Sequence, residues 1–428
     1  MLWPAAINSD NSSSANYSRA MSGKIVVVVG GGAAGLMAAL AASEHGAQVI
    51  LLEKNPRVGK KLLATGNGRC NYTNEDLKLA HFHGSDPNFI RTILSRFSGA
   101  QTLQYFYQLG VEPVTEEAGK VFPASGQASS ILDVLRHQAE YQGVALVSNT
   151  TAKRVDKNGS SFTVYTSVGS FIAEAVILAT GGKAGPQFGC SGDGYALAAR
   201  WGHKLIEPFP ALVQLRLKAP FLKAAAGVKV QGRAEVYHEA DRPSQAEGEL
   251  LFTNYGISGP PILAVSRAAS EALSRGHQPA LKLNLLPRQQ PDEVASYLQD
   301  RFRRLSHKTA ELSLVGFINK RLIIILLKEA GIELKLPAGK ISLAQIKRLA
   351  ALLTSWVFTV VGTNGWTAAQ VTAGGLDHRQ ICPRTLQSKL VPGLYFAGEL
   401  IDVDGDCGGY NLQWAWSSGY TAGVFAAL

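Results

Sequence analysis

Residues 24–35 read Lys-Ile-Val-Val-Val-Val-Gly-Gly-Gly-Ala-Ala-Gly, and this stretch decides the fold. Its apolar run, 25–29, predicts a buried β-strand that leads directly into the pattern Gly30-x-Gly32-x-x-Gly35. A helix of small residues follows, and a second apolar strand at 49–52 ends at Glu53. This order of strand, glycine turn, helix, strand and acidic residue predicts a βαβ unit that binds a dinucleotide.

Each glycine of this pattern meets a physical need of a bound dinucleotide. Gly30 permits the tight turn, Gly32 lets backbone N–H groups approach a pyrophosphate, and Gly35 lets the helix pack closely on the strand. The helix N-terminus adds partial positive charge. Glu53 lies eighteen residues beyond Gly35, where its carboxylate can accept hydrogen bonds from the ribose hydroxyls.

Composition places the chain among folded globular proteins. It has 428 residues, 46% of them hydrophobic and 17% charged, which predicts two or three domains. No apolar run is long enough for a membrane span, and residues 1–22 lack the hydrophobic segment of a secretory signal and are expected to form a disordered tail. The four cysteines are far apart, which argues against a metal site or a disulfide framework and favours a reducing cytoplasm.

Positive charge is concentrated in one segment. The formal net charge is +10, and residues 286–350 hold twelve Lys or Arg against six Asp or Glu. Arg301, Arg303, Arg304 and Lys308 cluster within this segment. Two interpretations stay open, a solvated helical surface and a patch that faces phosphates.

The order of strand and helix patterns along the chain predicts one nucleotide domain built from two separated pieces. An apolar strand ends in a glycine turn near residue 180 and again near residue 398, and a helix of small residues closes the chain. Between them lie short alternating stretches typical of antiparallel strands, and then a helical segment. The predicted boundaries are a tail at 1–22, the nucleotide domain at 23–190 and 377–428, a β-rich insert at 191–285 and 356–376, and a helical insert at 286–355.

Only one glycine fingerprint is present, which predicts a single tightly held nucleotide. Three features favour FAD as that nucleotide. Ala179-Thr180-Gly181 resembles the turn of FAD-binding oxidoreductases, and Gly393-Leu-Tyr-Phe-Ala-Gly398-Glu399 resembles their C-terminal strand. Gly408-Gly409-Tyr410-Asn411-Leu412 opens the last helix. A helix N-terminus aimed at the flavin would stabilise the negative charge of the reduced ring. The same helix can equally serve as a packing element, and both roles are compatible.

With these motifs assembled, the chain resembles the BaiN-like (YhiN-like) family of FAD-dependent oxidoreductases, which also carries the label aminoacetone oxidase family. The resemblance covers Lys24 to the C-terminus and implies an α/β fold with a discontinuous Rossmann-like FAD-binding domain, an inserted β-barrel-like domain and a small helical insert. The stretches that carry it are residues 59–71, 251–260, 371–375, 399–405 and 408–411.

The resemblance also implies a set of cofactor contacts. Ala33, Ala34 and Glu53 would bind the adenosine-diphosphate half, and Lys54, Lys60 and Lys61 would shield the pyrophosphate or the adenine ribose. Ala152 would meet adenine through its backbone. The flavin end would be lined by Gly66, Asn67, Gly68, Arg69 and Asn71, with Glu399, Asn411 and Leu412 at the ribityl chain and the isoalloxazine. The glycine turns add Gly30, Gly32, Gly35, Ala179, Thr180, Gly181, Gly398 and Gly409.

Because flavin itself carries hydride and electrons, the protein must supply orientation and, for reduction of a C=C bond, one proton donor. Cys70 and Tyr410 are the candidates. Cys70 follows Arg69, whose cation is expected to lower the pKa of the thiol and make it reactive. The alternative for Cys70 is a small buried thiol packed beside the cofactor.

Three functions compete on this evidence. The first is an oxidoreductase that takes electrons from NAD(P)H, as a transient donor, and reduces an unsaturated small-molecule substrate, as the bile-acid branch of the family implies. The second, implied by the YhiN-like branch, is reduction of uridine in rRNA to dihydrouridine. The basic segment supports it. Against it, no aromatic residue suited to base stacking is interleaved with these charges, apart from the two candidates Phe302 and Trp356. The third is an amine oxidase of the aminoacetone type. The substrate and the oligomeric state are not readable from the sequence.

Overall fold

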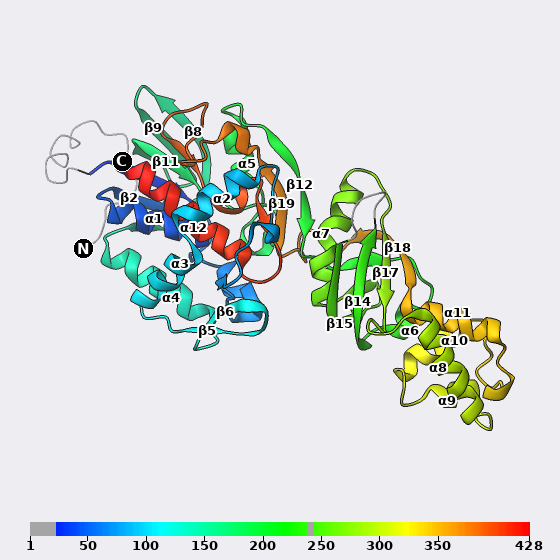
Figure 1. Ribbon diagram of the computed structural model, residues 1–428. Coiled ribbons are helices and arrows are strands. Elements are labelled where there is room, and N and C mark those ends of the chain that lie inside the picture. Colours follow the sequence, from blue (N-terminus) through cyan, green and yellow to red (C-terminus); the bar gives the residue numbers. More distant parts are fainter. Residues whose placement is uncertain (1–22, 238–243) are drawn as a thin grey trace. The chain divides into compact units, whose positions relative to one another are not determined.

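Strands from both ends of the chain form one parallel sheet in the order β20-β11-β1-β2-β7. The computed structural model describes residues 23–237 and 244–428, so the predicted tail at 1–22 lies outside the described residues. At the centre is β1 (Ile25–Val29), and its neighbours are β11 (Ala175–Leu178) and β2 (Gln48–Leu52), both parallel to it (Figure 1). β20 (Leu394–Phe396) and β7 (Ala145–Val147) form the edges. The middle of β1 is fully buried, as expected for a parallel strand covered on both faces.

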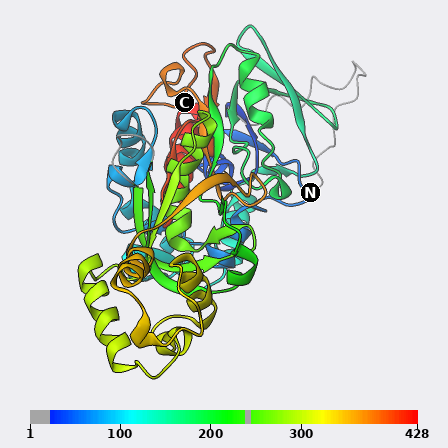
Figure 2. The same ribbon diagram turned by 90° about the vertical axis from the view of Figure 1, so that its right-hand side faces the viewer.

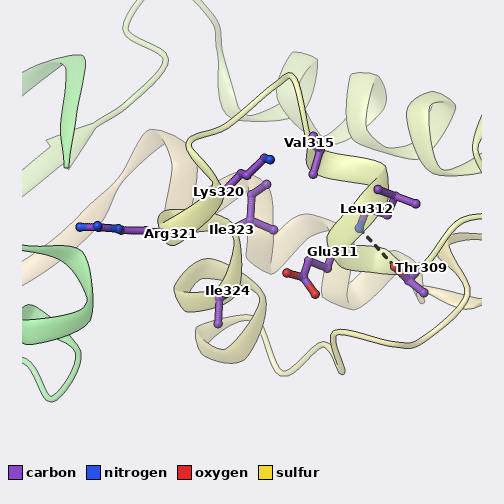
Figure 3. A pocket seen from close by; sticks show the side chains of 8 residues that line it. All are labelled: Thr309, Glu311, Leu312, Val315, Lys320, Arg321, Ile323 and Ile324. Atoms are coloured by element: carbon purple, nitrogen blue, oxygen red, sulfur yellow. Dashed lines mark hydrogen bonds between the residues drawn. The ribbon is translucent and has the colours of Figure 1, made fainter.

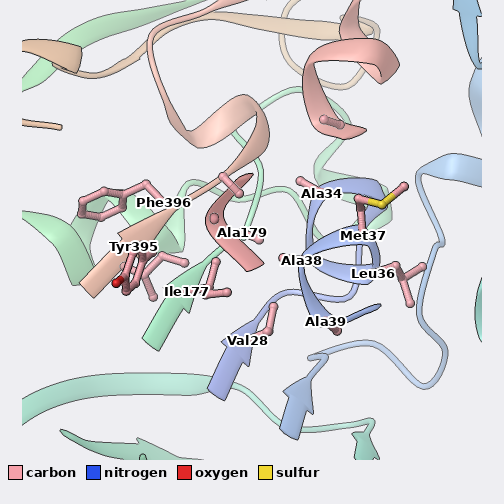
Figure 4. Packing of buried hydrophobic residues seen from close by; sticks show 14 of the residues in the cluster. Val28, Ala34, Leu36, Met37, Ala38, Ala39, Ile177, Ala179, Tyr395 and Phe396 are labelled. Atoms are coloured by element: carbon pink, nitrogen blue, oxygen red, sulfur yellow. The ribbon is translucent and has the colours of Figure 1, made fainter. Parts of the chain in front are cut away.

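Two helices from opposite ends of the sequence pack against each other over this sheet. They are α1 (Ala33–Glu44) and α12 (Tyr410–Ala427), the blue and red helices of Figure 1. A Cβ atom on Gly419 would lie 2.4 Å from the carbonyl oxygen of Ala34, and one on Gly423 would lie 2.3 Å from that of Ala38. Small residues thus let the two backbones touch, and the apolar side chains beneath them form one core (Figure 4). The discontinuous nucleotide domain expected from the sequence is confirmed.

Shorter elements surround this core. A ribbon of β4 (Phe82–His83) and β21 (Asp404–Gly405) joins the two pieces of the chain. The remaining helices of this part are α2 (Pro87–Arg96), α3 (Gly99–Gln108), α4 (Ala128–Tyr141) and α5 (Asp193–Ala199). The remaining strands are β3 (Thr73–Asn74), β5 (Pro113–Thr115) and β6 (Lys120–Pro123) in one sheet, β8 (Ala152–Asn158), β9 (Ser161–Thr166) and β10 (Ser170–Ala173) in another, and the pair β12 (Leu205–Ala211) and β19 (Val371–Leu376).

The middle of the chain forms a closed antiparallel barrel with its own core. Along its strand β18, Trp356, Phe358 and Val360 point inward while Val357 and Val361 are exposed, the alternation of a strand with one buried face. The barrel order is β13 (Leu215–Leu217), β16 (Gly256–Ser258), β15 (Ser244–Phe252), β14 (Lys229–Tyr237), β17 (Ala280–Asn284) and β18 (Trp356–Thr363), accompanied by α6 (Leu222–Ala225) and α7 (Pro260–Ser274). The predicted β-barrel is confirmed.

A helical insert extends the barrel between β17 and β18. It consists of α8 (Pro291–Arg304), α9 (Ala310–Leu314), α10 (Lys320–Glu329) and α11 (Leu343–Thr354). Figure 2 shows these helices as the group coloured from yellow-green to orange. Their apolar faces share one hydrophobic cluster with the barrel, so insert and barrel fold as one body.

The structure divides into two compact units, one formed by the residues up to Pro208 with Val371–Leu428 and the other by Phe209–Gln370. This division differs from the predicted boundaries at 190/191 and 376/377. The reason is that Tyr195, Leu197 and Ala198 of α5 belong to the core under the parallel sheet, and β19 pairs with β12. Within the described residues, no helix is both long and apolar enough to cross a membrane.

Candidate cofactor site

The glycine turn after β1 has the geometry that a nucleotide-binding turn needs. Gly30 has a φ of +106°, and a Cβ atom there would lie 2.5 Å from the carbonyl oxygen of Ala179. A Cβ atom on Gly35 would lie only 1.8 Å from the carbonyl oxygen of Gly30. Gly32 is different, because a Cβ atom there would meet nothing within 4 Å. The first and third glycines are therefore required by the fold, whereas the second leaves open space over the start of α1.

Four of the described α-helices of this unit, α1, α4, α5 and α12, lack a side-chain cap at the N-terminus. In α1 and α12 the N-cap residues are Gly32 and Gly409, and neither glycine has a side chain to satisfy the first amides. By contrast, α2 and α3 are capped by Asp86 and Ser98. The free amides and the positive end of a helix dipole suit an anionic group. FAD carries a pyrophosphate and a ring that becomes anionic on reduction, so these residues fit FAD.

Glu53 is anchored beside the turn. The Gly31 N–H donates to its Oε2 (2.8 Å), and the backbone N–H and side-chain Nδ2 of Asn55 donate to its Oε1 (2.8 and 2.7 Å). The Thr150 N–H donates to the Glu53 carbonyl oxygen (2.8 Å), which brings the segment before Ala152 next to Glu53. One lone pair of Oε2 stays available, as acceptance from a ribose hydroxyl requires.

The three predicted lysines have different surroundings. Lys54 Nζ lies 2.5 Å from Asp193 Oδ2 and donates to Ser191 Oγ at the same distance, so it ties the loop to α5. Lys61 Nζ lies 2.7 Å from Glu399 Oε2. Burial opposes the charge of Lys61, but attraction to Glu399 and Cys190 and the hydrogen bond with Glu399 together outweigh it and raise the pKa of the ammonium group. Lys60 is exposed. Lys54 and Lys61 therefore hold separate segments of the chain together.

The loop from Thr65 to Asn71 has an unusual backbone. Gly66, Asn67, Gly68 and Cys70 all adopt left-handed φ angles between 55° and 85°. Two of these are not glycine, and such strained residues concentrate at functional sites. A Cβ atom on Gly68 would meet nothing within 4 Å, so the loop presents open backbone next to Asn71.

Cys70 has a pKa opposite to the one expected from its neighbour. The thiol has no exposed surface, and burial raises its pKa to about 12, although a hydrogen bond with Thr65 lowers it in part. Arg69 does not act on the thiol, because its guanidinium pairs with Glu116 and lies 4.2 Å from the centre of the Phe122 ring. The prediction of an activated thiolate at Cys70 is wrong. The proposed contact of Cys70 with the cofactor does not depend on the pKa of the thiol.

The end of this loop meets the start of α12. Asn71 Oδ1 is buried and has no hydrogen-bond partner among the described residues, and a Cβ atom on Gly409 would lie 2.9 Å from it. Asn411 is bound to the backbone of Gly405, whose N–H donates to Asn411 Oδ1 (2.8 Å) and whose carbonyl accepts from Nδ2 (2.7 Å). Leu412 packs against the main core. An unsatisfied acceptor thus lies where the sequence predicts the flavin end.

The carboxyl ends of three neighbouring strands also meet the start of α1. The Ala179 N–H after β11 donates to the Val29 carbonyl (2.9 Å), and Gly181 has a φ of +72°. Thr180 stands between them, close to Gly194 of α5. A Cβ atom on Gly398 after β20 would lie 2.7 Å from Cβ of Ala34. The structure therefore brings together the predicted residues of β1, β11 and β20 at one sheet edge, where α/β folds bind ligands.

Sequence reasoning missed a cluster beside Tyr410. His81 and His83 both contact Asp406, at 3.0 and 2.8 Å, and the His81 ring stacks on Tyr410. The only local signal in the sequence was that the two histidines are two positions apart. Asp406 lies 325 positions from His81, and the strands that join them have two residues each, too short to predict.

A pocket of about 340 Å³ lies in the helical insert, in the other unit. None of the predicted cofactor residues lines it. Figure 3 shows the side chains of α9 on one side and those of α10 on the other. The lining residues are Thr309, Glu311, Leu312, Val315, Lys320, Arg321, Ile323 and Ile324.

Comparison with known proteins identifies the family and several relatives of this chain. The family model described as HI0933-like protein Rossmann domain matches residues 24–425. The chain is 39% identical to the 3-dehydro-bile acid delta(4,6)-reductase of Clostridium scindens over 92% of this chain and 96% of the relative. It is 30% identical to the ribosomal RNA dihydrouridine synthase of Haemophilus influenzae over 91% of this chain and 95% of the relative.

A likeness of fold extends to a solved flavoenzyme structure. The 3-ketosteroid delta1-dehydrogenase from Sterolibacterium denitrificans aligns with a TM-score of 0.50 and 14% identity, covering 94% of this chain and 99% of that chain. This likeness concerns the fold alone. The family resemblance read from the sequence is confirmed by the matches along nearly the whole chain. The chain therefore belongs to the HI0933-like Rossmann family, a family of FAD-dependent oxidoreductases.

Proposed function

We propose that this protein takes electrons from NAD(P)H and reduces a C=C bond conjugated to a carbonyl group in a steroid-like small molecule. The observation that carries the proposal is the pair of uncapped helix N-termini at Gly32 and Gly409, both in the unit that carries the dinucleotide fingerprint. The substrate class rests on the 39% identity to a protein named as a bile-acid reductase.

The chain's own groups would divide the binding of FAD between them. The first amides of α1 would hold the pyrophosphate, since Gly32 leaves their approach open. Glu53 would accept a hydrogen bond from the ribose through Oε2. The first turn of α12 would stabilise negative charge at the flavin end, and Asn71 Oδ1 would accept a hydrogen bond from a ring N–H. When bound, the flavin supplies hydride transfer.

Tyr410 is the favoured proton donor. Burial raises the pKa of its phenol to about 12, and the nearby groups Asp76, Asp406 and Cys407 add to the shift, so the phenol keeps its proton at neutral pH. Tyr410 also occupies the first position of α12. Cys70 is enclosed in the core, which favours the packing role for its thiol.

Tyr410→Phe is therefore expected to slow reoxidation of the reduced flavin by substrate about a hundredfold, the lower limit for loss of a general acid. FAD content should stay unchanged, because the aromatic ring is kept. Cys70→Ala should leave this rate within about threefold of wild type, the range of a packing change. Stopped-flow absorbance of the flavin under anaerobic conditions measures both. A large loss in Cys70→Ala alone would move the proton donor to the thiol.

Stopped-flow absorbance of the flavin also tests the proposed function. Anaerobic enzyme is mixed first with NADPH or NADH and then with a steroid enone, and the flavin should bleach in the first step and recover its colour in the second. Bleaching by aminoacetone but not by the nicotinamides would instead indicate the amine oxidase. Bleaching by nicotinamide without recovery on any enone would contradict the proposed substrate class.

A second candidate, reduction of uridine in rRNA, is favoured by the charge of the helical insert. Arg303, Arg304 and Lys320 are exposed, and Figure 3 shows Lys320 at the start of α10 beside the insert pocket. One relative is named a ribosomal RNA dihydrouridine synthase. However, Phe302 and Trp356, the two aromatic candidates for base stacking, are both buried, so neither is available to stack on bases. Nucleoside analysis of rRNA from a deletion strain decides the matter: loss of one dihydrouridine favours RNA, and an unchanged profile excludes this candidate.

The arginines of this segment should respond differently to mutation. Arg301 is a structural residue, because its Nε donates to the Ser313 carbonyl (2.7 Å) and its Nη2 to the Val315 carbonyl (3.2 Å). Arg301→Ala should lower the free energy of unfolding by about 2 kcal/mol. The matched variant Arg304→Ala, at an exposed position, should leave stability unchanged. Thermal unfolding measures both, and equal losses would contradict this assignment. Tests of RNA binding should therefore use Arg303 and Arg304.

A further inference from the structure

The ribbon that joins the two pieces of the nucleotide domain brings two histidines to one carboxylate. In its register His83 lies opposite Asp404 and Phe82 opposite Gly405. One step further the Asp406 N–H donates to the His81 carbonyl (2.9 Å). Backbone pairing alone therefore places the Asp406 side chain between His81 and His83.

The hydrogen bonds of this carboxylate define which ring nitrogens carry protons. A carboxylate only accepts, so His81 must donate from Nδ1 to Asp406 Oδ2 (3.0 Å), and His83 must donate from Nε2 to Oδ1 (2.8 Å). Burial opposes the charge of Asp406, but its hydrogen bonds with the two histidines and its attraction to them together outweigh that effect and lower its pKa. Asp406 thus stays ionised and holds both rings by hydrogen bonds.

His81 is the member of this cluster that contacts the proposed proton donor. Its ring lies parallel to that of Tyr410, with centroids 4.6 Å apart and planes inclined by 18°. The Phe82 ring meets Tyr410 edge-on at 5.6 Å. The Asp406 carbonyl also accepts from Asn411 Nδ2 (3.2 Å). The cluster is therefore fixed to the first turn of α12.

We propose that His81, oriented by Asp406, is a positioning residue for proton donation by Tyr410. This inference rests on the proposed function. The phenol gives its proton to the carbon next to the substrate carbonyl while hydride adds to the other alkene carbon. The phenolate that remains then takes a proton back from solvent. The stacked His81 ring fixes the plane of the Tyr410 ring, and with it the direction in which the phenol presents its proton.

The groups around Tyr410 keep its phenol protonated. Asp76 and Asp406 both disfavour the phenolate, and Cys407 adds to this effect. Asp76 Oδ2 lies 3.8 Å from His81 Nε2 and is itself paired with Lys78 (2.9 Å). The phenol therefore holds a proton to give, and the stacked His81 ring sets the direction of its O–H group.

The role of His81 can be tested by removing or keeping the stacked ring. His81→Ala removes the ring that lies on Tyr410, so the rate of reoxidation by substrate should fall roughly tenfold. His81→Phe keeps an aromatic ring on Tyr410 and should restore most of the wild-type rate. His83→Ala is the matched control, because His83 shares Asp406 without stacking on Tyr410, and it should keep the wild-type rate.

A second readout does not depend on turnover. In FAD-loaded protein labelled with fluorotyrosine, the ¹⁹F resonance that disappears in Tyr410→Phe belongs to Tyr410. Its chemical shift should be the same in wild type and His83→Ala, and should move in His81→Ala, which lacks the ring stacked on Tyr410.

The two possible failures are distinguishable. If the wild-type flavin is not reoxidised by any enone, the proposed function is wrong. If it is reoxidised and His81→Ala keeps the wild-type rate, the inference about His81 is overturned, whatever the ¹⁹F resonance shows.

Discussion

Gly32→Ala is expected to give a stable protein that no longer retains FAD. The new methyl group would meet no protein atom within 4 Å, and the φ of −80° is ordinary for alanine. The stability of the FAD-free protein should therefore change by less than about 1 kcal/mol, the range of a substitution at a helix N-cap. The methyl group would instead occupy the space through which a pyrophosphate reaches the amides of α1. We expect the Kd for FAD to rise at least about a hundredfold, or about 2.7 kcal/mol.

Substitutions of two other glycines serve as comparisons for this experiment. Gly362→Ala in β18 should change neither FAD binding nor stability, because its Cβ atom would approach only Arg216 Cδ, at 3.9 Å. Gly35→Ala should impair both, since the methyl group would lie 1.8 Å from the Gly30 carbonyl oxygen. Isothermal titration of FAD into apoprotein, paired with thermal unfolding, separates these cases. Wild-type affinity in Gly32→Ala would show that the pyrophosphate does not lie over α1.

Glu53→Ala is expected to have the second large effect, and it should lower both the stability of the protein and its affinity for FAD. It removes the acceptor of the Gly31 N–H and of two donors of Asn55, and Glu53 is buried. Buried donors that lose a charged acceptor cost about 1–3 kcal/mol, so we expect the free energy of unfolding to fall by about 3 kcal/mol. The Kd for FAD should rise at least about a hundredfold, because the ribose loses its acceptor.

Glu174→Ala supplies the control. Glu174 Oε2 also accepts a backbone N–H of β1, that of Ile25 (2.9 Å), but at an exposed position. Solvent can replace that bond, so a loss below about 1 kcal/mol and unchanged FAD binding are expected. Chemical denaturation of the FAD-free proteins measures the first property and titration the second. A Glu53→Ala protein that binds FAD as tightly as wild type would remove the ribose contact from the proposal.

The part of the fold that could be predicted is the part formed by contiguous residues. The strand, glycine turn, helix and strand ending at Glu53 were predicted from periodicity alone, and the structure has β1, α1 and β2 at those positions. The pKa of Cys70 could not be predicted in this way. Its sequence neighbour Arg69 pairs with Glu116, 47 positions away, and burial of the thiol depends on the whole core.

The aromatic residues of the insert show a different reason for error. Val294, Leu298 and Phe302 recur every four residues on α8 and are all buried, which is the spacing of an apolar helix face. The neighbouring arginines drew attention to charge, whereas the spacing already indicated that Phe302 belongs to the core. His81 and Asp406 carried no comparable signal, because a two-residue ribbon leaves no periodic pattern.

The crossing of α1 and α12 has a consequence for synthesis on the ribosome. The barrel and its helices form one uninterrupted stretch, Phe209–Gln370, with its own core, so they can fold before the C-terminal residues that follow have left the ribosome. During that interval the face of α1 around Ala34 and Ala38 has no partner, and β11 lacks the neighbouring strand β20. We therefore expect the nascent chain to bind chaperones through this apolar helix and to take up flavin only after α12 has left the exit tunnel.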